Sequence, residues 1–203
     1  MHPEALTEKG RVIFTKLSVF AEYYLAGGTA LALYLGHRQS VDFDLFSPDP
    51  IPRDLLAKVK RVFGVAAPSV NNPDELTVFI DGVKITFLHY PFPLVSDLVV
   101  YEGVRMLSIL ELAATKAYTI GRRGTYKDYV DLYEVLSGKH ASLETIIDLA
   151  KQKYRDEFNA RLFLEQLIYL DDTEDTGILF LGKSVSKGDM RIFFESCVRD
   201  FKL

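Results

Sequence analysis

Cysteine is nearly absent from this chain of 203 residues, in which Cys197 is the only one. A single thiol excludes an intramolecular disulfide framework and is typical of a reducing compartment. No run of about 18 apolar residues occurs, so the sequence predicts no transmembrane helix. The start at Met1 has no basic region followed by an apolar one, so we expect no signal peptide. These absences favour a soluble cytoplasmic protein with no membrane partner.

An excess of basic residues is also missing, since the formal net charge is −4. No overall positive field attracts nucleic acid, and any contact with RNA would need a local basic patch. There is no internal repeat and no low-complexity linker. The hydrophobic content of 48% is enough for one large core or two small ones.

The hydrophobic patterns predict an α+β protein with an α/β half over residues 1–107 and a helical half over residues 108–203, packed closely together. In the first half the expected helices cover residues 5–24, 29–36 and 51–63, with Thr29 as an N-cap and Gly36 at a helix end. The expected strands cover residues 24–26, 38–46, 65–70, 77–80, 83–88, 97–100 and 104–107. Asp81-Gly82 between two of these strands is a strong hairpin signal.

The second half is expected to contain only helices and loops. The expected helices cover residues 108–118, 126–136, a third from Ser142, 159–170 and 188–201. Ser108 and Glu111 have the spacing of a capping box. Residues 122–124 form a basic turn, and residues 171–175 form an acidic loop.

Leu25 to Phe46, read as LAGGTALALYLGHRQSVDFDLF, is the stretch with the clearest chemistry. Gly27-Gly28 lets backbone N–H groups approach an anion at the start of a helix. Strand periodicity places Asp42 and Asp44 on one face, about 7 Å apart, where they can share a divalent ion. Magnesium suits such a pair because it prefers oxygen ligands and keeps water or phosphate in its shell. The stretch therefore predicts a metal and triphosphate site.

Each part of this pattern also has an ordinary structural interpretation. A Gly-Gly turn before a helix is common, and Asp-x-Asp on a strand is often a solvated face. The order of the two, separated by one helix, favours the functional interpretation. Arg38 and Ser40 between them would add contacts to phosphate.

The residues of this stretch resemble the first motif of the DNA polymerase β-like nucleotidyltransferases, and more narrowly the AbiEii/AbiGii toxins of type IV toxin–antitoxin and abortive-infection systems. The resemblance continues in GVKITFLHYPFPL at Gly82–Leu94 and in LELAATKAYTIGRRGTYKDYVDLYEVL at 110–136. It covers roughly residues 24–137, and three motifs in the family's order make it fairly specific.

The resemblance implies a nucleotidyltransferase-fold lobe, with a small mixed sheet flanked by helices, followed by a helical lobe. It implies Mg²⁺ on Asp42 and Asp44, and a nucleoside triphosphate with its phosphates at Gly28 and Thr29. It also implies a catalytic contribution from Lys116 and an aspartate of the 127–131 segment. Its expected partners are an NTP, a macromolecular acceptor such as tRNA, and a cognate antitoxin that acts without forming a stable complex.

Lys116 falls on the apolar stripe of its predicted helix, where a buried ammonium needs a partner. A carboxylate or a phosphate would satisfy it, and a side chain that reaches solvent at the edge of the stripe is the alternative. On the next helix Asp128 and Asp131 are neighbours that could anchor Lys116, orient an arginine or act as a base. Lys127 with Asp131 also fits an ordinary surface pair.

Arg122, Arg123 and Lys127 are the densest basic patch in the chain. The patch would suit a nucleotide or an RNA backbone, and a solvated turn is equally consistent with it.

Thr86 breaks the family pattern. The polymerase β-like enzymes typically carry a third carboxylate on a strand after Asp-x-Asp, and Thr86 stands at that place, on the face shared by Lys84 and Leu88. Asp128 or Asp131 could replace the base, the acceptor could need little base assistance, or the protein could bind nucleotide without efficient turnover. His89 is a further candidate base.

We therefore expect a magnesium-dependent nucleotidyltransferase-like toxin that transfers a nucleotidyl or phosphoryl group to a macromolecular hydroxyl. A catalytically weak or inactive module of the same fold, which binds nucleotide or another protein, is the rival hypothesis. A purely structural domain is a third.

Overall fold

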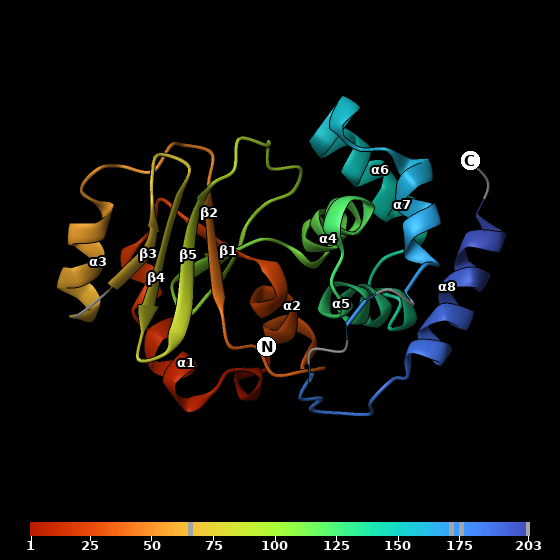
Figure 1. The fold of residues 1–203 in the computed structure, drawn as a ribbon, viewed down its shortest axis with the longest axis horizontal. Coiled ribbons are helices and arrows are strands. Elements are labelled where there is room, and N and C mark those ends of the chain that lie inside the picture. The colour runs from red at the N-terminus through yellow and green to blue at the C-terminus, as the bar shows by residue number, and fades with distance from the viewer. Residues whose placement is uncertain (65–66, 171–172, 175–176, 202–203) are drawn as a thin grey trace. The chain divides into compact units, whose positions relative to one another are not determined.

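The computed structural model describes residues 1–64, 67–170, 173–174 and 177–201. The chain divides into two compact units (Figure 1). Unit 1 contains Met1–Pro93 and Asp97–Leu107, and unit 2 contains Leu94–Ser96 and Ser108–Leu203. The short segment Leu94–Ser96 therefore belongs to unit 2 although unit 1 flanks it on both sides.

Unit 1 is built on a mixed sheet of seven strands in the order β3-β4-β5-β2-β1-β7-β6. Strand β2 runs parallel to β5 and antiparallel to β1, so it is central in the sheet. The strands are β1 (Tyr24–Ala26), β2 (Phe43–Ser47), β3 (Ala67–Asn71), β4 (Glu75–Ile80), β5 (Val83–His89), β6 (Val99–Tyr101) and β7 (Val104–Met106). This α+β architecture confirms the predicted fold class.

The expected hairpin is present between β4 and β5. Asp81 has φ 52° and Gly82 has φ 84°, the two positive values that a tight two-residue hairpin turn requires. Along β2 and β5 the side chains alternate, with Phe43 and Phe87 on the buried face. The opposite face of both strands holds the polar residues of interest.

The helices and 3₁₀ turns of unit 1 are η1 (Pro3–Ala5), α1 (Glu8–Phe14), η2 (Leu17–Val19), α2 (Gly27–Leu35) and α3 (Leu55–Phe63). The single helix predicted over residues 5–24 is wrong, because α1 ends at Phe14 and a 3₁₀ turn follows. Phe20 explains the break: its ring packs 5.1 Å from that of Phe87 and stacks 6.0 Å from that of Phe63. This tertiary packing overrides the helical spacing of the apolar residues.

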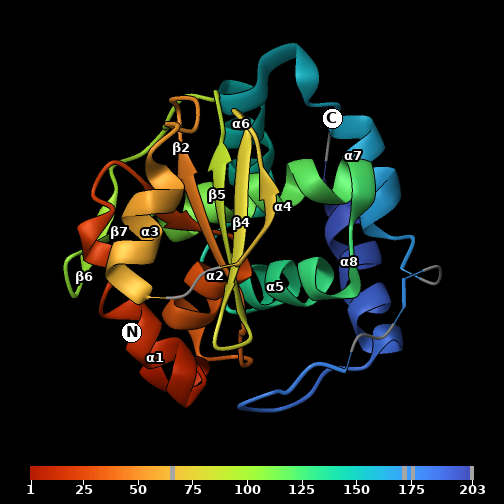
Figure 2. The ribbon, with the colours of Figure 1, turned by 60° about the vertical axis from the view of Figure 1, so that its left-hand side comes forward.

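Unit 2 is helical and contains α4 (Ile109–Arg123), α5 (Tyr126–Ser137), α6 (Leu143–Tyr154), η3 (Arg155–Glu157), α7 (Ala160–Leu167) and α8 (Lys187–Asp200). Helix α4 packs against α5, α6 and α7, and α8 packs against α5 (Figure 2). The predicted acidic loop at 171–175 lies largely outside the described residues. Within the described part of the chain, no helix combines the length and apolar character needed to span a bilayer.

The start of α4 corrects a further prediction. Ser108 caps the helix by accepting a hydrogen bond from the Glu111 N–H at 3.2 Å. A capping box also requires the Glu111 side chain to accept a hydrogen bond from the backbone N–H of Ser108. The Glu111 side chain does not make this contact. Its Oε1 instead lies 2.7 Å from Lys153 Nζ, and both side chains are fully buried. The complete capping box is at α5, between Thr125 and Asp128.

Candidate functional site

Asp42 and Asp44 lie on the polar face of the sheet of unit 1. Asp44 is in β2 and pairs with Thr86 of β5 on one side and with Ala26 of β1 on the other. Asp42 precedes the strand, which begins at Phe43, and its carboxylate is 43% exposed. Lys84 Nζ lies 3.7 Å from Asp42 Oδ2. Asp42 and Asp44 therefore stand on the accessible face of the sheet, with Lys84 beside Asp42. The strand predicted from residue 38 is shorter than expected, and Val41 is exposed.

Gly27 lies directly against the Asp44 carboxylate. It has φ +66°, and a Cβ built on it would be 2.4 Å from Asp44 Oδ2. Only glycine fits this position, because any side chain would meet the carboxylate and would also strain the backbone. Gly27 and Gly28 are the first two residues of α2, whose first N–H groups have no partner within the helix. The turn therefore places the first N–H groups of α2 next to the Asp44 carboxylate.

Thr29 and Ser40 form a buried brace under this turn. The predicted N-cap role of Thr29 is wrong, because α2 starts two residues earlier with Ala26 as its N-cap. Thr29 Oγ1 instead donates to the backbone carbonyl of Asp42 and lies 2.7 Å from Ser40 Oγ. Both hydroxyls therefore fix the segment that carries Asp42.

Arg38 is buried rather than exposed to solvent, with 4% of its surface accessible. Its Nη1 donates to the carbonyl of Gln39 at 3.2 Å. The structure thus gives Arg38 a local backbone contact within the loop that precedes β2.

Lys116 of α4 is buried between two carboxylates of α5. Its Nζ lies 2.7 Å from Asp128 Oδ1 and 2.7 Å from Asp131 Oδ2, and the Asp131 side chain is fully buried. The inward-facing lysine with a carboxylate partner, as expected from its place on the apolar stripe, is present. The alternatives of a lysine that reaches solvent and of a surface pair between Lys127 and Asp131 do not describe this arrangement.

Asp128 has two roles in this cluster. Its Oδ2 accepts hydrogen bonds from the Thr125 N–H at 2.9 Å and from the Thr125 hydroxyl at 2.8 Å. Burial by itself would raise the pKa of Asp128, but the ammonium of Lys116 and the Thr125 donors outweigh it. The pKa of this carboxyl is therefore lower than its ordinary value, and the group is held ionised.

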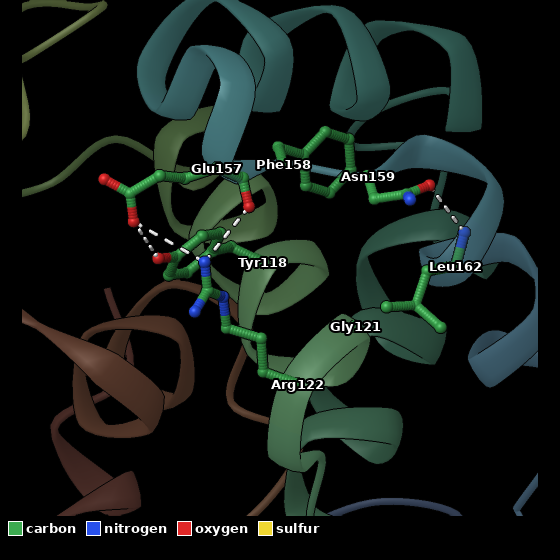
Figure 3. Close-up of a pocket in the computed structure, with 7 residues that line it drawn as sticks. All are labelled: Tyr118, Gly121, Arg122, Glu157, Phe158, Asn159 and Leu162. Atoms are coloured by element: carbon green, nitrogen blue, oxygen red, sulfur yellow. Dashed lines mark hydrogen bonds and ion pairs between the residues drawn. The ribbon is translucent and has the colours of Figure 1, made fainter.

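The three residues of the predicted basic patch, Arg122, Arg123 and Lys127, have different surroundings in the structure. Arg122 Nη2 donates to the Glu157 carbonyl at 3.1 Å, and its guanidinium lies 4.4 Å from the centre of the Tyr118 ring. Figure 3 shows these residues around a pocket of about 230 Å³ lined also by Phe158 and Asn159.

Arg123 is exposed and Lys127 is half-buried. Arg122 is also exposed, but its guanidinium is held by Glu157 and Tyr118.

The hydrogen-bonded groups that were not expected from the sequence include two that contain a glutamate of the core or of the sheet. One is the buried pair of Glu111 and Lys153, which are 42 residues apart in the chain. The other links Glu75, Thr77 and Thr86 on the polar face of the sheet. Counting outward from the Asp81-Gly82 turn would have paired Thr77 with Thr86, so the second group had a signal in the sequence.

The carboxylates of Asp42 and Asp44 suit a metal ion whose other ligands come from the substrate. Among the described residues, no group of three or more His, Cys, Asp or Glu side chains could hold an ion by itself. Two carboxylates beside an anion-binding turn leave ligand positions for phosphate oxygens and water, which Mg²⁺ prefers to retain. The residues present therefore fit Mg²⁺ bound jointly with an NTP.

Comparison with known proteins identifies the family of the chain. The family model described as "Nucleotidyl transferase AbiEii toxin, Type IV TA system" matches residues 12–92 and 85–203. An uncharacterised protein of Aquifex aeolicus is 30% identical over 167 residues, which cover 78% of this chain and 79% of that protein.

Solved structures share the fold at low identity. MenT4, a nucleotidyltransferase toxin of Mycobacterium tuberculosis, is 15% identical with a TM-score of 0.61, over 94% of this chain and 83% of that one. JHP933 of Helicobacter pylori is 16% identical with a TM-score of 0.54, over 96% and 95%. The chain therefore belongs to the nucleotidyl transferase AbiEii toxin family of type IV toxin–antitoxin systems, and it is a nucleotidyltransferase.

Proposed function

We propose that this protein is a magnesium-dependent toxin that binds an NTP and transfers its nucleotidyl group to a hydroxyl of a macromolecule such as tRNA. The observation that carries the proposal is the contact between Gly27 and the Asp44 carboxylate. This contact places the turn, whose N–H groups can receive an anion, directly beside the carboxylate that we propose as a metal ligand. Phosphoryl chemistry needs mainly such positioning and charge neutralisation.

The residues of unit 1 would divide the work as follows. Asp42 and Asp44 would hold Mg²⁺, which neutralises phosphate charge and polarises the phosphoryl group. The N–H groups of Gly27 and Gly28 would receive phosphate oxygens at the N-terminus of α2. Thr29 and Ser40 would act indirectly, because their hydroxyls hold the backbone segment that carries Asp42. Arg38 would contribute to the electrostatic field of the site from its buried position.

The candidate residues of unit 2 are a buried lysine and the basic residues that follow it in the chain. Lys116 is the candidate phosphate-binding cation, held in place by Asp128 and Asp131. Arg123 and Lys127 are candidates for contact with nucleotide or RNA, and Arg122 would join them by exchanging its Glu157 contact for phosphate. Such phosphate contacts would make binding weaker at high salt.

The experiment that tests this function follows label from each α-³²P NTP, with Mg²⁺, into total cellular RNA and total cellular protein. Asp42→Ala and Asp44→Ala should each abolish the labelled product, because the metal ligands are lost. Asp97→Ala, which removes an exposed carboxylate elsewhere in unit 1, is the matched control and should retain transfer. Labelled product with both metal-ligand variants would refute the proposed site.

The rival function is a module that binds nucleotide or another protein without turnover, and Thr86 is the observation that favours it. The rival predicts that NTP binds in a magnesium-dependent manner while no pool becomes labelled. Calorimetric titration with each NTP, with and without Mg²⁺, separates it from a structural domain, which would bind none.

The partner we propose is an antitoxin encoded with this protein that suppresses its effect without forming a stable complex. Expression of the toxin should slow growth, and co-expression of the neighbouring gene should restore it. Size-exclusion chromatography of the mixed proteins should show two separate peaks. A stable joint peak would contradict this form of neutralisation.

A further inference from the structure

Lys84 is a charged side chain beside Asp42 that the proposed function leaves without a role. It lies in β5 on the same face as Thr86, and its Nζ is 3.7 Å from Asp42 Oδ2. That separation exceeds a hydrogen bond, and the described residues offer Lys84 no other ion pair. The Lys84 side chain is 39% exposed and that of Asp42 is 43% exposed. Because so loose and exposed a pair contributes little to stability, the lysine can exchange Asp42 for another anion.

Lys116 differs from Lys84 in how firmly the protein holds it. The Nζ of Lys116 lies 2.7 Å from both Asp128 and Asp131, and its side chain is 9% exposed. Lys84 has neither such short contacts nor such burial. Its ammonium is therefore accessible to a ligand on the face of the sheet that carries the proposed metal ligands.

Lys84 and Gly27 lie on opposite flanks of β2. The strand order β5-β2-β1 separates β5, which carries Lys84, from β1, which leads into α2 (Figure 1). Gly27 meets Asp44 from the β1 side, whereas Lys84 meets Asp42 from the β5 side. The two carboxylates thus stand between the first N–H groups of α2 and the ammonium of Lys84.

The geometry of phosphoryl transfer gives the two flanks of β2 different roles. The attacking and the leaving oxygen lie roughly in line, on opposite sides of the phosphorus. With the phosphates of the NTP at the N-terminus of α2, as proposed above, the acceptor hydroxyl enters from the β5 flank. Lys84 stands on that flank.

The charge of the acceptor explains why a cation is useful there. An RNA end carries a phosphate beside its terminal nucleotide, whereas a serine or threonine hydroxyl of a protein carries no charge. The RNA phosphate must approach Asp42 and Asp44 on a chain whose net charge is −4. A lysine on the acceptor flank offsets this repulsion, and an uncharged acceptor would not need it.

We propose that the acceptor is an RNA end and that Lys84 binds it, by exchanging Asp42 for the phosphate that joins the last two nucleotides. The proposal rests on the nucleotidyl transfer proposed above and selects RNA over protein as the class of acceptor. Lys84 is then a specificity-determining residue that contacts the substrate. Its departure from Asp42 also frees that carboxylate for its proposed role as a metal ligand.

The first test measures RNA binding without NTP, so that the result does not depend on turnover. The probe is a fluorescent synthetic RNA hairpin with a single-stranded 3′ end, and its Kd is measured by anisotropy at several salt concentrations. Lys84→Met should raise this Kd about tenfold, the effect of losing one charged contact. It should also reduce the slope of log Kd against log salt concentration by about 0.7, because one contact with a single-strand phosphate is lost.

A chemically altered RNA tests the individual contact. A neutral methylphosphonate in place of the phosphate between the last two nucleotides should raise the Kd of the wild-type protein about tenfold. It should not raise the Kd of Lys84→Met any further. The same replacement within the duplex stem is the control and should affect the two proteins equally.

Two protein variants serve as further controls. Lys84→Arg keeps a cation that binds phosphate and should retain most of the RNA affinity. Lys60→Met removes an exposed lysine of α3, which packs through Phe63 and Phe20 on the opposite face of the sheet. It should leave the Kd and the salt dependence unchanged. The Kd of Lys84→Met for NTP with Mg²⁺ should not rise, because the triphosphate lies on the other flank of β2.

The outcomes separate this contact from the proposed function. An equal penalty from the terminal methylphosphonate in the wild type and in Lys84→Met would overturn the contact. A raised Kd of Lys84→Met for NTP would also overturn it, since Lys84 would then serve the triphosphate. Label transferred to protein and not to RNA would overturn the RNA acceptor and leave nucleotidyl transfer intact. RNA binding that depends on Lys84, with no transfer of label, would support the contact and refute the proposed function.

Discussion

Replacing Gly27 by alanine should disable the site through a single methyl group. The Cβ would stand 2.4 Å from Asp44 Oδ2, whereas ordinary contacts begin at 3.4 Å, so the carboxylate must retreat by about 1 Å. A displacement of that size typically costs about 100-fold in rate. The positive φ of +66° adds backbone strain of about 1 kcal/mol to the folded state. We therefore expect a folded, slightly destabilised protein with about 1% of the transfer activity.

Gly82→Ala is the control for strain without displacement. Gly82 has φ +84°, and a Cβ there would meet nothing within 4 Å. It should lose a similar amount of stability, about 1 kcal/mol, and keep its activity. Urea unfolding measures the stability of both variants, and single-turnover label transfer measures the rate.

Two results would refute the reasoning about Gly27. If Gly27→Ala transferred label as fast as Gly82→Ala, the position of the Asp44 carboxylate would not limit the reaction. If Gly27→Ala lost activity only because it was unfolded, the steric argument would also fail, and the urea midpoint reveals this directly.

Further predictions concern the buried charges of unit 2. Lys153→Met leaves the Glu111 carboxylate buried without its counter-ion and should cost about 3–5 kcal/mol in urea unfolding, whereas Arg161→Ala breaks an exposed pair and should cost less than about 0.5 kcal/mol. The pKa of Asp128 is lower in the folded state than in the unfolded chain. The ionised carboxylate therefore stabilises the fold fully above the pKa of an unfolded aspartate, and this contribution is lost as the pH falls through the folded-state pKa. Asp128→Asn should therefore lower stability at neutral pH and flatten the acid side of the stability profile, and an unchanged acid side would contradict this.

Local sequence patterns correctly predicted those features that depend only on residues close together in the chain. Asp81-Gly82 fixed the hairpin, and alternation fixed the buried face of β5. Gly36 ends α2 with φ 64°, as its position after an apolar run suggested. Lys116 on an apolar stripe predicted a buried partner, since an ammonium cannot be buried alone.

Contacts between distant segments decided the rest. Phe20 leaves helical geometry because it packs against Phe87, and Glu111 leaves its capping box because Lys153 needs a carboxylate in the core. Neither partner is visible in a local window. Glu75 was missed because the strand was expected to begin at Thr77, which left out the residue two positions earlier on the same face.

The division of the chain at Leu94–Ser96 has a consequence for anyone who wishes to study the units separately. The N–H groups of Val95 and Ser96 donate to the Glu111 carboxylate, each at 3.2 Å, and the Ser96 hydroxyl donates to it at 2.9 Å. A fragment cut after Leu107 would carry these donors away from Glu111, and the helical fragment would retain a buried carboxylate with Lys153 alone.

Cutting the gene at the apparent border should thus yield two poorly behaved pieces. A permuted gene, or a helical fragment preceded by a short copy of residues 94–96, is the better design.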